Sequence, residues 1–86
     1  MRVIVTHDVD DVQHWLASPK RDEFFAEHGM TAHTFTQPDG GNRVGVVIED
    51  VPDMETLQSA LGTAMAAAAM KHDGVRPDSI RMYVES

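Results

Sequence analysis

The chain contains no cysteine among its 86 residues. It therefore has no disulfide, no thiolate metal site and no cysteine nucleophile, and its composition fits a reducing compartment. No apolar stretch approaches the ~20 residues that a membrane-spanning helix needs. The N-terminus turns acidic after a very short apolar run, unlike a signal or transit peptide. We therefore expect a soluble cytoplasmic protein that does not associate with membranes.

Positive charge is also scarce. Seven Lys and Arg residues stand against 14 Asp and Glu residues, which gives a net charge of -7. Such a chain repels phosphate backbones, and no basic patch interleaved with aromatic residues is present, so we expect no nucleic acid partner. The glycine pair Gly40-Gly41 follows Pro38-Asp39 and has the composition of a turn rather than of a phosphate-binding loop.

Hydrophobic periodicity and turn residues predict a single domain over residues 1–86 in the order β-α-β-β-α-β. The expected elements are a strand at 2–7, one bent or two short helices at about 10–28, a hairpin of strands at 30–37 and 42–49, one helix between Asp53 and Gly74, and a strand at 79–85. With right-handed crossovers this order predicts a ferredoxin-like α+β fold with an antiparallel sheet. We place strands 2–7 and 42–49 at its centre, as a parallel pair.

The strand at 42–49 has no polar face. A near-continuous apolar run indicates a strand that is covered on both sides. A chain of this length covers one face of a sheet with its own helices and has little left for the other. We therefore expect a homodimer in which the second face meets another copy. The set facing the helices is Val44, Val46 and Ile48, and the set facing the partner is Gly45, Val47 and Glu49.

Several short patterns spread over most of the chain resemble a known superfamily. They are Val9-x-Asp11-x-x-x-Trp15, Phe24 and Phe25 before Gly29, Asn42-x-Val44-x-Val46, Asp53-x-x-x-Leu57, and Met65 to Met70 followed by Gly74-Val75. The chain resembles the dimeric α+β barrel superfamily, in particular small proteins related to antibiotic biosynthesis monooxygenases and stress-responsive barrel proteins.

This resemblance implies two sheets packed face to face across a dyad, with the helices outside. It also implies a pocket between each sheet and its first helix, or inside the barrel. Members of the superfamily include cofactor-independent monooxygenases, polyketide cyclases, haem-degrading enzymes, chlorite dismutase relatives and proteins without demonstrated catalysis. No histidine here has the sequence context of a haem ligand, and we expect no cofactor.

Histidine is the residue type in this chain best suited to proton transfer near neutral pH. The candidate catalytic residues are His33, His14 and Tyr83. The candidate substrate contacts are Trp15, Phe35, Arg81 and His7. Aromatic side chains would form an apolar wall, and an arginine would orient an oxyanion or carboxylate. The alternative for the residues on the partner-facing side of the sheet is a structural role as polar contacts of the dimer.

The histidine and aspartate residues do not match a metal-binding motif. His7 and His14 flank Asp8, Asp10 and Asp11 across a strand-helix junction, and no HExxH or facial-triad pattern occurs. The acidic cluster lacks the glycine and the distal glutamate of a calcium loop. We interpret it as a helix start, where carboxylates face the positive end of the helix dipole, and we expect no metal.

Three functions are compatible with the sequence. The first is a dimeric barrel that binds a small aromatic or polyketide-like molecule and catalyses cofactor-independent oxygenation, cyclisation or isomerisation. It requires an apolar cavity of about a few hundred Å³ with a histidine at its edge. The second is a non-catalytic dimeric barrel with a packed interior, related to stress or to ligand binding. An amino-acid-binding regulatory domain with the same element order is a third alternative.

Overall fold

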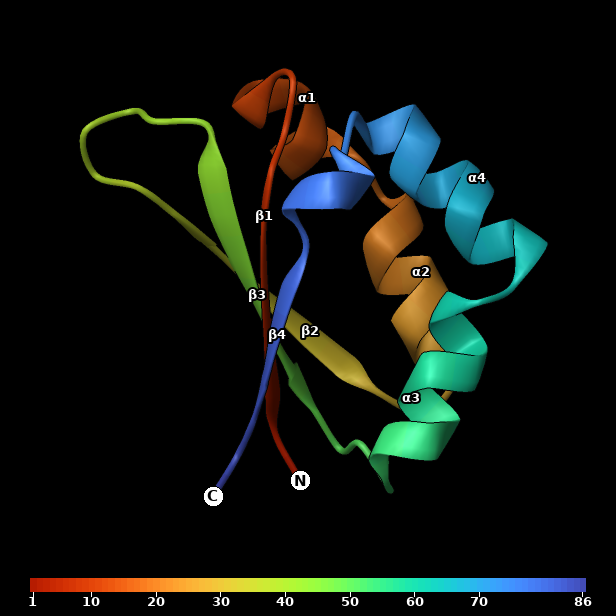
Figure 1. Ribbon diagram of the computed structural model, residues 1–86. Coiled ribbons are helices and arrows are strands. Elements are labelled where there is room, and N and C mark those ends of the chain that lie inside the picture. The colour runs from red at the N-terminus through yellow and green to blue at the C-terminus, as the bar shows by residue number, and fades with distance from the viewer.

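The computed structural model describes residues 1–86 as a four-stranded sheet with helices packed on one of its faces (Figure 1). The strands are β1 (Val3–Asp8), β2 (Thr31–Thr36), β3 (Arg43–Glu49) and β4 (Arg81–Val84). The helices are α1 (Val12–Ala17), α2 (Lys20–Glu27), α3 (Met54–Leu61) and α4 (Ala64–Asp73), and the short 3-10 helix η1 (Pro77–Ser79) precedes β4. The predicted ferredoxin-like α+β fold is confirmed. None of these helices is both long and apolar enough to cross a membrane.

The sheet has the strand order β2-β3-β1-β4, and every neighbouring pair is antiparallel. Strands β1 and β3 are central, as predicted. They run antiparallel, because Val3 lies opposite Ile48 and His7 lies opposite Val44. The prediction of a parallel central pair was therefore wrong. The crossover through α1 and α2 makes β2 parallel to β1, and the β2–β3 loop over residues 37–42 then places β3 between them, antiparallel to both.

The single helix predicted between Asp53 and Gly74 is divided into α3 and α4. Thr63 leaves the helical conformation, with φ -82 and ψ 158, and its hydroxyl oxygen accepts a hydrogen bond from the Ala66 amide at 3.2 Å. This contact caps a new helix. Because the break shifts the helical phase, Ala66 faces the core while Met65 is 47% exposed.

The hydrophobic core lies between the sheet and the helices. It consists of 14 buried apolar residues that form one cluster, in which Trp15 and Leu57 are almost completely inaccessible to solvent. On β3 the burial follows the predicted alternation. The buried residues are Val44, Val46 and Ile48, and the half-buried ones are Gly45, Val47 and Glu49.

The opposite face of the sheet is not covered by any element of the chain (Figure 1). Large apolar side chains lie on it: Ile4 is 43% exposed, Phe35 is 57% exposed and Tyr83 is 56% exposed. The strand register places Ile4 directly between Val47 and Tyr83, so these side chains form one row across the sheet. The chain therefore presents an apolar sheet surface to its surroundings.

Candidate functional site

A cavity of about 410 Å³ lies between the covered face of the sheet and the helices. Apolar side chains from both layers make most of its wall. They include Val46 and Met82 from the strands and Phe24, Leu61 and Met70 from the helices. This size and this lining suit a small organic ligand.

Three ionisable side chains interrupt the apolar wall: His7, Arg21 and Asp73. The side chains of His7 and Asp73 are almost fully buried, with 6% and 4% exposure. Asp73 accepts a hydrogen bond from Nδ1 of His72 at 2.9 Å. By contrast, Nδ1 of His7 and Nε of Arg21 are buried and have no hydrogen-bond partner in the chain. Buried polar atoms without partners are rare and costly, so their occurrence in a cavity wall marks a candidate binding site.

The indole ring of Trp15 contacts both His7 and Arg21. The ring of His7 meets it edge-on, with centroids 5.8 Å apart and planes at 81°. The guanidinium carbon of Arg21 lies 4.3 Å from the indole centroid, and Nη1 of Arg21 donates to the Trp15 carbonyl oxygen at 3.3 Å. A cation over an aromatic face is attracted by the ring quadrupole, more strongly when water is excluded. Helix α1 thus positions both polar groups through one buried side chain.

The environment of His7 favours its neutral form. Burial lowers the pKa of the imidazole below its ordinary value of 6.5, and the nearby positive charge of Arg21 acts in the same direction. The backbone contact with Asp8 opposes both effects. A neutral imidazole at pH 7 is able to accept a proton. A guanidinium nearby in the same wall is able to stabilise the anion that such a transfer leaves behind.

The depressed pKa of His7 predicts that the protein loses stability in mild acid. The unfolded chain binds the proton near pH 6.5 and the folded chain only at lower pH. The contribution is therefore fully present above pH 6.5 and is lost as the pH falls from that value to the lower pKa of the folded chain, at up to about 1.4 kcal/mol per pH unit for one proton. Urea denaturation of wild type and His7→Gln between about pH 7.5 and 5.5 measures the difference, with His28→Gln as control. Parallel pH profiles for wild type and His7→Gln would contradict this assignment.

Among the residues selected from the sequence, His7 and Trp15 line the cavity. His14 does not. It is exposed on α1, and its Nε2 atom lies 2.7 Å from the carbonyl oxygen of His72 at the end of α4. The cavity therefore contains one of the selected histidines, and it is the one proposed for substrate contact rather than for catalysis.

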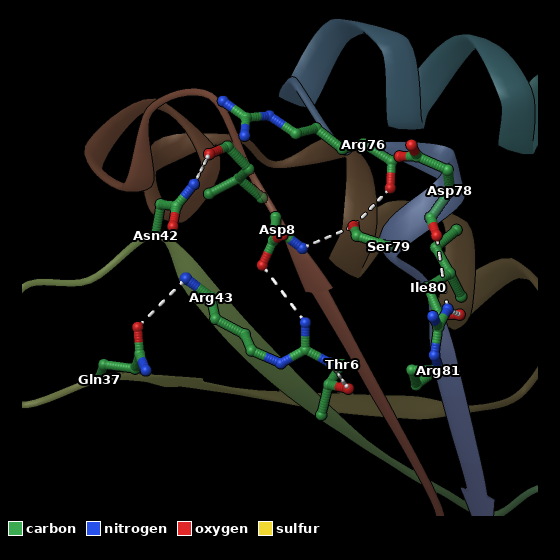
Figure 2. A network of polar contacts seen from close by, with 11 residues as sticks. Thr6, Asp8, Gln37, Asn42, Arg43, Arg76, Asp78, Ser79, Ile80 and Arg81 are labelled. Atoms are coloured by element: carbon green, nitrogen blue, oxygen red, sulfur yellow. Dashed lines mark hydrogen bonds and ion pairs between the residues drawn. The ribbon is translucent and has the colours of Figure 1, made fainter.

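The remaining selected residues lie on the uncovered face of the sheet. They are His33, Phe35, Tyr83 and Arg81. Nε2 of His33 contacts the Glu49 carboxylate at 2.9 Å. Figure 2 shows the Arg81 guanidinium at the start of β4, where Nη1 donates to the carbonyl oxygens of the two residues Asp78 and Ile80 at 3.4 and 2.9 Å. The fold thus separates these side chains from the cavity by the thickness of the sheet.

Two polar residues of the cavity wall, Arg21 and Asp73, were not identified from the sequence. A signal for Arg21 exists, because it precedes Phe24 and Phe25 by three and four residues and so shares their face of α2. Asp73 follows Met70 by three residues on α4. The side of α4 on which Asp73 lies can be predicted only once the break at Thr63 is known.

No protein-family model matches the chain, and no curated protein matches it significantly in sequence. Solved structures do match. A crystal structure of an antibiotic biosynthesis monooxygenase is similar with a TM-score of 0.60 and 15% identity, over 99% of this chain and 97% of that one. The protein YjcS is similar with a TM-score of 0.55 and 8% identity over the full length of both chains. The fold is therefore antibiotic biosynthesis monooxygenase-like, which confirms the resemblance inferred from the sequence.

Proposed function

We propose that the protein binds a small, partly aromatic organic molecule in the cavity between the sheet and the helices. The observation that carries the proposal is a cavity of about 410 Å³ whose apolar wall also contains His7 and Arg21. An apolar space with a few polar groups is the usual form of a small-molecule site. The similarity to an antibiotic biosynthesis monooxygenase structure supports the same class of ligand.

In the catalytic version of this function, His7 is the general base. Its neutral imidazole accepts a proton from an acidic C–H or O–H group of the ligand and becomes an imidazolium. The electron pair stays on the ligand as an enolate or phenolate, and the Arg21 guanidinium stabilises that negative charge. Such an anion is reactive toward molecular oxygen or toward a carbonyl group of the same molecule. Cofactor-independent oxygenation or cyclisation is therefore the chemistry that we propose.

A non-catalytic ligand-binding protein is the second candidate. It is favoured by the lining, in which 13 of 18 residues are hydrophobic, and by the contact of the Arg21 guanidinium with the Trp15 ring. The two candidates share the cavity and its ligand class. They differ in whether the bound molecule is converted or released unchanged.

We also propose that two copies pack sheet to sheet to form a barrel. Helices cover only one face of the sheet (Figure 1), and the other face carries the exposed side chains of Ile4, Phe35 and Tyr83. Apolar patches of this kind mark interaction surfaces. The half-buried Val47 lies in the same row as Ile4, on the central pair of strands. A second copy of the chain is the partner that fits this surface, because one isologous contact covers the exposed sheet faces of both copies.

Filling the cavity is expected to weaken ligand binding. Ala69 lines the cavity from α4, so Ala69→Phe places an aromatic ring in the space that a ligand needs. Fluorescence titration with anilinonaphthalene sulfonate, an aromatic anion, measures the effect. We expect the dissociation constant to rise by about tenfold or more, which corresponds to about 1.4 kcal/mol per factor of ten.

Ala67→Phe is the matched control. Ala67 lies on the same helix and is exposed, outside the cavity wall. We expect this variant to bind the dye as the wild type does. Equal dye affinity in Ala69→Phe and wild type would refute the cavity as the binding site.

A further inference from the structure

Three metal-ligating side chains meet where α1 lies against the end of α4. They are His14, His72 and Asp73, and each offers a ligand atom within 4.8 Å of the other two. The two imidazole rings have centroids 5.2 Å apart. Nδ1 of His72 and Oδ1 of Asp73 are 2.9 Å apart. Because His14 and His72 are 58 positions apart in the sequence, no local spacing reveals this cluster.

We propose that this cluster binds a divalent transition-metal cation such as Zn²⁺ or Ni²⁺. Two imidazoles and one carboxylate form a donor set that suits these ions. Metal–ligand bonds of about 2.0–2.2 Å place neighbouring donor atoms of a tetrahedral site roughly 3.4 Å apart. The His72–Asp73 pair is already near this separation. His14 is exposed and reaches it by rotation of its side chain, which gives up the 2.7 Å contact of its Nε2 atom with the His72 carbonyl oxygen.

The backbone holds the two halves of the cluster in place. The Asp10 amide, just before α1, donates to the Gly74 carbonyl oxygen, just after α4, at 3.0 Å. Nε of Arg76 contacts the Asp10 carboxylate at 2.9 Å, and Val9 forms a β-bridge with Val75. These contacts hold the start of α1 next to the end of α4. A preorganised pair of elements lowers the cost of bringing the ligands together on binding.

The local charge also favours a cation. Asp73 is a carboxylate with only 4% exposure, and its one ion-pair partner is the half-exposed His72. A buried carboxylate is costly without a compensating positive charge. The cluster lies at the end of α4, where the helix dipole is negative. Asp73 also lines the cavity, so the bound ion would lie at the edge of the ligand site.

Isothermal titration of the untagged chain with Zn²⁺ at about pH 7.5 tests the proposal. We expect one saturable site per chain, and about tenfold or more weaker binding in His14→Gln and in His72→Gln, each of which removes a ligand. His28→Gln is the matched control, because His28 lies outside the cluster and its loss is expected to leave the affinity unchanged. Equal affinity in His14→Gln and wild type, or no saturable binding, would overturn the proposal.

A second measurement identifies the ligands without relying on the variants. Paramagnetic Ni²⁺ is expected to broaden the imidazole NMR signals of His14 and His72 and to spare those of His28. Broadening at His28 alone would place the ion elsewhere. Neither experiment requires an organic ligand, so its failure would leave the proposed function of the cavity unaffected.

Discussion

Val47→Asp is expected to convert a dimer of this protein into a monomer. Val47 lies in the middle of the uncovered sheet face, directly opposite His33 on β2 and Ile4 on β1. A carboxylate at this position would be buried without a partner when two sheets meet, which costs several kcal/mol, roughly enough to abolish a small interface. In a single chain the same side chain is only half-buried, so the fold is expected to survive.

Light scattering coupled to size-exclusion chromatography measures the mass of the particle directly. Met65→Asp is the control, because Met65 is 47% exposed on the helical layer rather than on the sheet. We expect wild type and Met65→Asp to have twice the mass of the chain and Val47→Asp to have the mass of one chain. A Val47→Asp protein that remains dimeric would show that the uncovered face is not the interface.

Trp15→Ala is expected to lower the free energy of unfolding by about 3–5 kcal/mol. The side chain is 1% exposed, so its removal leaves a large hole that the surrounding core fills only in part. It also removes the ring that contacts His7 and Arg21. A loss of this size is a large share of the total stability of about 5–15 kcal/mol that is typical of a domain.

Urea denaturation followed by circular dichroism at a fixed protein concentration measures this loss. Fluorescence is unsuitable, because Trp15 is the single tryptophan of the chain. Leu16→Ala is the neighbouring control, since Leu16 is 39% exposed and a surface change of this kind costs about 0.5 kcal/mol. A loss below about 1 kcal/mol for Trp15→Ala would mean that α1 does not anchor the cavity wall.

The resemblance left the pocket either between the sheet and its first helix or inside a barrel, and the residues selected from the sequence include Phe35 and Tyr83 of the uncovered face. The cavity lies on the other face, beneath the helices, and His7 reaches it because β1 alternates between Val3, Val5 and His7 on its covered side. A pattern with a period of two separates the faces of a strand. It does not tell which face leaves room for a ligand, because that depends on how tightly the helices pack.

The residue pattern alone was enough to predict the element order, the central place of β1 and β3, and the apolar alternation of β3. These features follow from local rules: β-branched residues favour strands, Pro and Gly mark turns, and side chains alternate along a strand. The sequence also resembles antibiotic biosynthesis monooxygenase-like proteins. That resemblance rests on patterns spread over the chain and was confirmed at the level of the fold.

The sites at which chemistry is possible depend on the packing of the folded chain. Packing brings His7, Arg21 and Asp73 into one cavity wall, and it brings His14 next to His72 across 58 positions of sequence. The physical reason is that local propensities act over a few residues. A cavity or a ligand cluster instead depends on distances between elements, which the packing of helices on the sheet sets. The break at Thr63 illustrates the point, because one capped turn changed which residues of α4 face the cavity.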